Sequence, residues 1–139
     1  MLVRCLYASR LETKLTPTLL SEVLEQSRRN NPSRGITGLL CYTQDVFVQV
    51  LEGGREEVSG LLARLMQDSR HKDVTILLFE EIDERRFSGW SMGQVNIDLV
   101  NPGLLLKYSS RPKLDPFAGS GQTVMSLLLE LIATGAIGG

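Results

Sequence analysis

The chain has 139 residues, 42% of them hydrophobic, and a formal net charge of -1. This size suits one globular domain with a buried core, and the balanced charge argues against a nucleic-acid partner. Two isolated cysteines and a single histidine, His71, argue against a zinc site, while the lack of a signal-peptide layout or of an apolar run of about 18 residues predicts a cytoplasmic protein without a membrane partner.

The first segments predict a strand followed by a helix. Residues 2–7 are apolar apart from one charge and predict the strand, and residues 8–15 predict a loop. Thr16 is a suitable N-cap, and Pro17 suits the first helical position. Because the residue before a proline avoids helical geometry, we expect this helix to end at Asn30-Asn31-Pro32.

The next segments predict a β-hairpin and a second helix. Residues 35–43 and 46–53 are strand-like runs separated by Gln44-Asp45, so they are expected to pair. Residues 54–70 predict an amphipathic helix with acidic residues in its first turn. The side chains expected to face inward are Val58, Leu61, Leu62, Leu65 and Met66.

Two further strands, at residues 74–82 and 90–96, complete the order βαββαββ. This order predicts an α+β, ferredoxin-like fold with a five-stranded, mixed and mainly antiparallel sheet. Two helices are expected on one face of the sheet. Residues 101–109 and 121–139 predict C-terminal helices that cover the other face.

Gln49 and Tyr7 are polar residues inside apolar strands. Strand alternation places Gln49 on the same face as Phe47 and Leu51. A buried amide without partners costs about 1–3 kcal/mol, so Gln49 needs hydrogen bonds. Taken alone, Gln49 is better explained by a structural role than by a functional one, and Tyr7 by a core position with one hydrogen bond.

Other polar positions also have a structural explanation when taken singly. Asn30-Asn31 suits a helix end, and Arg64 with Asp68 suits an exposed ion pair four residues apart. Trp90 and Met92 share a strand face, where ordinary packing explains them. The sequence shows no Ser/His/Asp set beyond chance, no P-loop and no GxGxxG after a strand, so no enzyme site is predicted.

The motifs LYASR, RNNPSRGITGLLCY, FVQVLEG, DSRH and RRFSGWSM, in this order, resemble the BLUF domain, a blue-light sensor using FAD. The resemblance covers residues 1–96. It implies a photosensor domain over 1–96 and a C-terminal helical extension over 97–139 for output or oligomerisation. It also implies a photoreceptor rather than an enzyme, with a non-covalently bound flavin.

The resemblance assigns roles to individual positions. Tyr7 matches the tyrosine that donates an electron and a proton to the excited flavin, and Gln49 matches the glutamine between that tyrosine and the ring. Trp90 and Met92 match the pair that relays the signal. The flavin contacts implied by this match are Tyr7, Asn30, Asn31, Gln49, Arg64, Asp68 and Arg70. Since a flat apolar ring fits between two amphipathic helices over a sheet, the apolar residues Leu24, Ile36, Phe47 and Leu65 are the expected ring walls.

The implied mechanism is a light-driven change at Gln49. Its amide rotates or tautomerises, strengthens a hydrogen bond to the flavin and shifts the absorption to the red. FAD is the expected cofactor, with FMN or riboflavin as alternatives. A downstream signalling protein of unknown identity and a homo-oligomer are the expected partners. The competing functions are a small acylphosphatase-like enzyme and a flavin-binding module without photochemistry.

Overall fold

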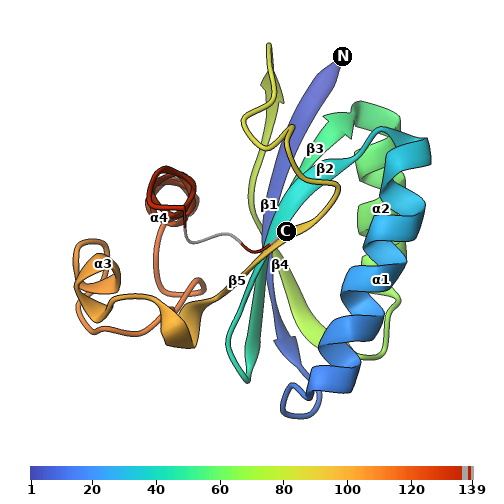
Figure 1. Ribbon diagram of the computed structural model, residues 1–139. Coiled ribbons are helices and arrows are strands. Elements are labelled where there is room, and N and C mark those ends of the chain that lie inside the picture. Colours follow the sequence, from blue (N-terminus) through green and yellow to red (C-terminus); the bar gives the residue numbers. More distant parts are fainter. Residues whose placement is uncertain (136–137, 139) are drawn as a thin grey trace.

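A computed structural model of the chain describes residues 1–135 and 138. The described elements follow the predicted order βαββαββ and continue into the tail helices (Figure 1). They are β1 (Leu2–Leu11), α1 (Pro17–Arg34), β2 (Thr37–Tyr42), β3 (Val46–Gly54), α2 (Arg55–Met66), β4 (His71–Ile82), β5 (Gly93–Asn96), the 3-10 helix η1 (Ile97–Leu99), α3 (Pro102–Leu106) and α4 (Gly121–Ala133).

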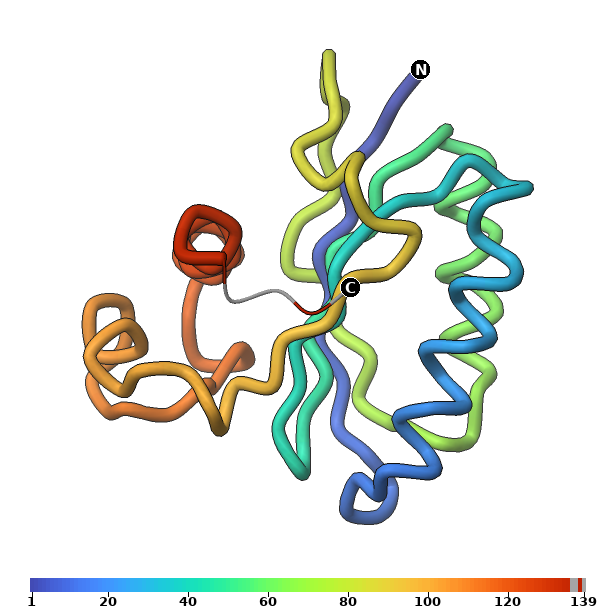
Figure 2. The backbone as a smooth tube through the Cα atoms, viewed as in Figure 1, coloured from blue at the N-terminus to red at the C-terminus, as the bar shows by residue number. Residues whose placement is uncertain are grey.

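The sheet has five strands in the order β4-β1-β3-β2-β5. All neighbouring pairs are antiparallel except β2 and β5, which are parallel. Helices α1 and α2 lie on one face, and α3 and α4 lie on the other (Figures 1 and 2). The predicted ferredoxin-like α+β fold, including the hairpin of β2 and β3, is therefore confirmed.

Each face of the sheet has its own hydrophobic core. The cavity-side core lies between the sheet and α1 and α2, and includes Tyr7, Phe47 and Met92. The tail-side core lies between the sheet and the tail, and includes Phe87 and Leu128. Because strand side chains alternate between faces, the central strands supply both cores and need few polar residues.

Helix α1 runs past the predicted end at Asn30-Asn31-Pro32, so that boundary was wrong. It continues through Pro32 to Arg34. Gly35 ends it with a left-handed φ of 64°, and its N–H donates to the carbonyls of Asn31 and Pro32. A glycine in this conformation satisfies free carbonyl groups, which offsets the hydrogen bond that Pro32 cannot make.

Two strand boundaries also differ from prediction. Residues 8–11 belong to β1 rather than to a loop, because Arg10 pairs with Val46 of β3 and Leu11 pairs with His71 of β4. Residues 90–92 precede β5, which begins only at Gly93. They end a crossing segment, residues 83–92, that runs from β4 at one sheet edge to β5 at the other (Figure 2).

The second helix and the tail helices are shorter than predicted. Helix α2 ends at Met66, which is 51% exposed and does not face inward as predicted. Helix α4 ends at Ala133, and the predicted helical residues 136, 137 and 139 lie outside the described part. In the described part of the chain, no helix has both the length and the apolar character needed to span a bilayer.

Candidate functional site

A cavity of about 290 Å³ lies between α1, α2 and the sheet. Its walls combine apolar side chains with amide, hydroxyl and charged groups, as in sites for flat organic ligands. The lining residues are Tyr7, Leu11, Leu19, Val23, Gln26, Ser27, Asn30, Asn31, Arg34, Leu40, Phe47, Gln49, Leu61, Arg64, Leu65, Asp68, Arg70 and His71.

Regular structure directs these side chains to one place. The α1 residues of the lining recur at intervals of three and four, which puts them on one face of the helix. Tyr7 of β1 and Gln49 of β3 face them from the centre of the sheet. Arg64 of α2 and Arg70, just before β4, lie on the remaining side.

Tyr7 and Gln49 are joined by a hydrogen bond inside the cavity-side core. The Tyr7 hydroxyl donates to Oε1 of Gln49, and Nε2 of Gln49 donates to Sδ of Met92 at 3.2 Å. The two residues are 1% and 4% exposed. Burial raises the pKa of Tyr7, and negative charge at Cys5 or Asp68 adds to this effect, so the hydroxyl keeps its proton at neutral pH.

The amide of Asn31 links α1 to the crossing segment. Asn31 is 2% exposed, and its Nδ2 donates to the carbonyl of Ser91 at 2.9 Å. One turn earlier, Nε of Arg28 donates to the carbonyl of Met92 at 3.2 Å. The cavity wall and the residues before β5 are thus fixed to each other by two side chains of one helix.

Asp68 and Arg70 form a pair at the cavity rim. The Asp68 carboxylate accepts from Nε of Arg70 at 3.0 Å and from its backbone N–H at 2.9 Å. The hydrogen bond from Arg70 lowers the pKa of Asp68, and the same bond raises the pKa of Arg70. Asp68 follows α2 instead of lying on it, so the predicted Arg64–Asp68 helix pair is replaced by this one.

The structure brings most predicted contact residues together, with two exceptions among the ring walls. Leu24 and Ile36 are 4% and 1% exposed and belong to the packed cavity-side core, outside the cavity lining. Ile36 lies beyond the end of α1 and packs near Gly53. On α1, the apolar lining is made by Leu19 and Val23 instead.

The two predicted relay residues occupy different layers. Met92 is buried in the cavity-side core and touches Gln49. Trp90 is half-buried and packs against the tail-side core. They do not share a strand face as predicted, because the chain passes from one face to the other beside β2, where the Gly38 N–H donates to the Trp90 carbonyl at 3.0 Å.

His71 is a lining residue that the sequence did not place in the site. It is 9% exposed, and its Nδ1 lies 2.8 Å from Oγ of Ser9. Burial lowers the pKa of His71, with Asp68 acting against that effect. The extension of β1 to Leu11 creates this contact, so a signal for it would have been the β-strand pattern continuing past Tyr7.

Comparisons with known proteins agree with this geometry. A family model described as "BLUF: Sensors of blue-light using FAD" matches residues 2–93. Photoactivated adenylate cyclase subunit beta of Euglena gracilis is 34% identical over 95 residues, which cover 68% of this chain and 11% of that protein. The blue light- and temperature-regulated antirepressor BluF of Escherichia coli (strain K12) is 30% identical over 87 residues, covering 63% of this chain and 22% of that protein.

Solved structures are similar over nearly the whole chain. The structure titled "BlsA photo-activated state" has a TM-score of 0.84 and 32% identity, and the match covers 95% of both chains. The structure titled "BlrB - a BLUF protein, dark state structure" has a TM-score of 0.80 and 30% identity, covering 96% of each. The chain spans about a tenth of the length of the Euglena relative.

Proposed function

Because the chain belongs to the BLUF family of blue-light sensors that use FAD, we propose how its own residues respond to light. The chain is a flavin-binding blue-light photoreceptor. In our proposal, Tyr7 and Gln49 convert light absorption into a rearranged hydrogen-bond network. The observation that carries this proposal is the buried Tyr7–Gln49 hydrogen bond inside the cavity. It joins a group that can release a proton to an amide with two possible orientations.

The residues present fit a flavin. The ring system is flat and apolar, with polar atoms at one edge, and the cavity has apolar walls with amides at one side. Asn31 donates from Nδ2 to the carbonyl of Ser91. Its amide oxygen is therefore the group that would accept a hydrogen bond from a flavin N–H. Tyr7, Asn30, Gln49, Phe47 and Leu65 would contact the ring, whereas Arg64, Asp68 and Arg70 would line the side-chain end.

We propose FAD as the bound flavin, with FMN and riboflavin as the alternatives to be tested. A more open hollow shares Gln26, Asn30 and Arg70 with the cavity and adds Glu22, Glu25 and Arg29. Arg70 is already paired with Asp68, so Arg29 is the guanidinium group at this rim that a phosphate of FAD would meet. The measurement is chromatography of the chromophore released from purified protein, and release of FMN or riboflavin alone would reject FAD.

The chain's own residues supply the switch. A bound flavin would absorb blue light and, when excited, would accept an electron and a proton. Tyr7 would supply both, and its neutral state at rest follows from its raised pKa. While Tyr7 lacks this proton, Gln49 has no donor at Oε1, so its amide is free to rotate or tautomerise; the electron and the proton then return to Tyr7 and the flavin is oxidised again.

A rotated amide cannot repeat its contact with Met92. In the present orientation Nε2 donates to Sδ of Met92. After rotation Oε1 would face that sulfur, and two acceptors do not form a hydrogen bond. Met92 would therefore be released from Gln49, and the change would reach the crossing segment and Trp90 on the opposite face.

We place the sensor in residues 1–96 and the output or oligomerisation surface in 97–139. The proposal treats the chain as a sensor that acts on a partner protein or on its own oligomer, and not as an acylphosphatase-like enzyme. It is supported by α4, whose apolar side chains pack against the sheet behind the cavity.

Light scattering in darkness and under blue light tests the oligomer, and an unchanged monomer in both would reject it. A cytoplasmic location stays a prediction.

The test of the photoreceptor uses purified protein loaded with FAD. Blue light should shift the flavin absorption band to the red by several nanometres without bleaching it, and darkness should reverse the shift. A protein that takes up flavin but shows no reversible shift would support the module without photochemistry. A protein that cannot take up flavin would reject both flavin functions.

A further inference from the structure

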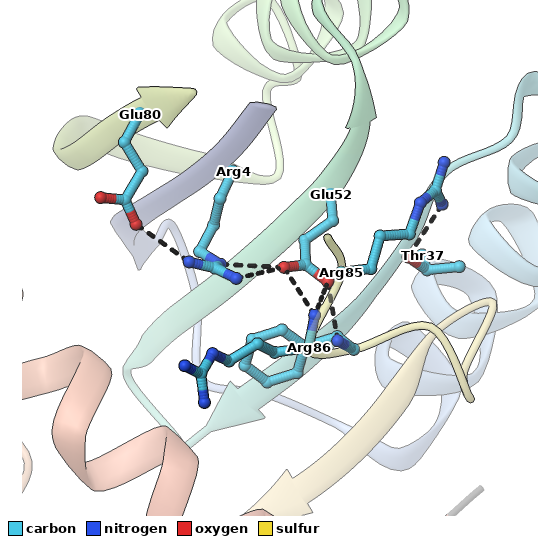
Figure 3. Close-up of polar contacts among 7 residues, drawn as sticks. Arg4, Thr37, Glu52, Glu80, Arg85 and Arg86 are labelled. Carbon is cyan, nitrogen blue, oxygen red and sulfur yellow. Dashed lines mark hydrogen bonds and ion pairs between the residues drawn. The ribbon is translucent and has the colours of Figure 1, made fainter. Parts of the chain in front are cut away.

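Glu52 is a carboxylate without solvent exposure that lies on β3, three residues after Gln49. Its Oε2 accepts from Nε of Arg4 at 2.9 Å and lies 2.7 Å from Nη2 of the same residue. Its Oε1 accepts the backbone N–H of Phe87 at 2.7 Å, and the backbone N–H of Arg86 lies 3.0 and 3.1 Å from the two oxygens. Figure 3 shows Glu52 between these donors.

These contacts are more specific than charge compensation requires. A buried carboxylate is costly unless it is paired and hydrogen-bonded, and Arg4 supplies the pairing. The remaining acceptor capacity goes to two consecutive N–H groups of the crossing segment. Glu52 therefore binds the main chain of that segment. These two contacts do not depend on which side chains stand at positions 86 and 87.

The crossing segment is held at both of its ends. At its start, Arg86 and Phe87 are bound by Glu52, and the Phe87 ring is fully buried in the tail-side core. Within it, the Trp90 N–H donates to the Phe87 carbonyl at 3.4 Å. At its end, Sδ of Met92 accepts from Gln49, and the carbonyls of Ser91 and Met92 accept from Asn31 and Arg28 of α1.

Strand β3 thus contacts the crossing segment from both faces of the sheet. Glu52 is the third residue after Gln49, so the two side chains point to opposite faces. Gln49 belongs with the cavity-side core, and Glu52 lies on the tail side with Phe87. The chain from Phe87 to Met92 therefore connects the residue that Glu52 holds to the residue that Gln49 contacts.

We propose that Glu52 is a positioning residue of the photoreceptor: it fixes the main chain of Arg86 and Phe87, and thereby sets where the Met92 thioether meets the Gln49 amide. The inference rests on the proposed function, since Gln49 must rearrange in light for the place of Met92 to matter. Glu52 lies outside the cavity lining, so it acts through Met92 and not on the flavin. It favours the arrangement in which the Gln49 amide donates to Met92, which we assign to the dark state.

The first experiment compares Glu52→Gln with the matched control Glu80→Gln. Glutamine keeps the shape of Glu52 but turns one acceptor into an NH2 group that faces N–H donors. Glu80 accepts from Nη1 of the same Arg4 at 3.0 Å but is exposed, and among the described residues it makes no hydrogen bond or ion pair with the crossing segment. Both proteins are purified with FAD, and dark recovery of the red-shifted state is timed.

We expect both variants to bind flavin and to show the red shift. Dark recovery of Glu52→Gln should be slower by about threefold or more, because the dark position of Met92 is less favoured, whereas Glu80→Gln should stay within about twofold of the wild type. Emission of Trp90, the one tryptophan of the chain, should change in Glu52→Gln and not in Glu80→Gln.

A double-mutant cycle separates positioning from a general loss of stability. If Glu52 acts through Met92, adding Glu52→Gln to Met92→Leu should not slow recovery further. A full Glu52 effect in the Met92→Leu protein would overturn the proposal. All rates are measured well below the melting temperature of each variant.

A second variant keeps the proposal testable if Glu52→Gln does not fold. Glu52→Asp retains the charge for Arg4, but its carboxylate is one methylene shorter and cannot bind both backbone N–H groups as before. It should slow recovery in the same way, and wild-type amides of Arg86 and Phe87 should exchange slowly in darkness. Unchanged dark recovery in folded Glu52→Asp would reject the role of Glu52. Fast hydrogen exchange at the wild-type amides of Arg86 and Phe87 would reject it as well. A wild type without any red shift rejects the proposed function itself.

Discussion

Tyr7 and Gln49 are register partners on the antiparallel strands β1 and β3, and the Tyr7 hydroxyl donates a hydrogen bond to Oε1 of Gln49. Directly opposed residues of such a pair carry their side chains on the same face. Strand pairing alone therefore brings the two polar groups together. Because these strands are central in the sheet, the geometry of the bond is fixed by the most buried part of the fold.

Tyr7→Phe is expected to abolish the light-induced red shift while the protein still binds flavin. The change removes the proton that must leave, and it also leaves Oε1 of Gln49 without its donor, at a cost of about 1–3 kcal/mol of unfolding free energy. Gln49→Ala should abolish the shift too, because no amide remains to rearrange. Difference spectra before and after blue light measure both effects.

Tyr42→Phe is the matched control for the tyrosine variant. Tyr42 also donates to a glutamine, Gln94, at 3.3 Å, but neither residue lines the cavity. Its loss should leave the red shift intact. A normal, reversible shift in either Tyr7→Phe or Gln49→Ala would contradict the proposed switch.

Met92 and Trp90 are predicted to have separable effects. Met92→Leu removes the sulfur that accepts from Gln49 at 3.2 Å, so the dark state is less favoured and recovery should be several-fold slower. Trp90→Phe changes packing against the tail-side core and should leave recovery within about twofold. Timed recovery in darkness measures both, and equal effects of the two variants would argue against a direct role of Met92.

Stability should fall as the pH rises above 9. Burial raises the pKa of Cys5 from 9.0 to about 11, and burial also raises the pKa of Cys41 and Tyr7. Between pH 9 and 11 the unfolded chain therefore releases protons that the folded chain keeps. Since the unfolded state binds fewer protons, the free energy of unfolding drops by about 1.4 kcal/mol per pH unit for each such group.

Urea unfolding of the FAD-loaded protein between pH 8 and pH 10.5 checks this dependence. Cys5→Ala removes one of the groups, so its unfolding free energy should decrease less steeply with pH than that of the wild type. The comparison uses slopes, because the lost thiol also changes packing at every pH. Identical slopes would show that Cys5 does not hold its proton in the folded state.

The fold could be predicted because apolar patterns in residues 2–7, 35–53 and 74–82 are those of strands, and they need no knowledge of their neighbours. The errors lie where contacts between distant parts of the chain determine the local structure. Residues 8–11 become strand through pairing with Val46 and His71, and the crossing segment leaves the sheet to reach its far edge. Pro32 stays helical because Gly35 satisfies the carbonyls near the helix end.

The candidate site was also predicted only in part. The resemblance to the BLUF family identified Tyr7, Gln49 and Asn31 as site residues, and the fold places all three around one cavity. Leu24 was chosen for its apolar character alone, and a small rotation of α1 decides which of its leucines faces the cavity. His71 finds its partner Ser9 62 residues away, and only the strand pattern continuing past Tyr7 points to that contact. Glu52 finds Phe87 35 residues away, and no local pattern points to it.

Gly121 is predicted to be the point on which docking of the tail depends. A methyl group added there would lie 2.4 Å from the carbonyl oxygen of Leu77 and 2.7 Å from Cγ of Leu78, both in β4. Backbone atoms cannot yield by that amount, so Gly121→Ala should push the start of α4 away from the sheet. The cost of such overpacking is about 1–3 kcal/mol, which should lower the melting temperature by several degrees.

Gly119→Ala provides the matched control, because a methyl group there meets nothing within 4 Å. Hydrogen exchange should become faster in α4 of Gly121→Ala and stay unchanged in Gly119→Ala. The flavin red shift should persist in both, since Tyr7 and Gln49 lie on the other face of the sheet. Equal exchange and melting in the two variants would mean that α4 does not pack on β4 through Gly121, and loss of the red shift would mean that tail docking controls the cavity itself.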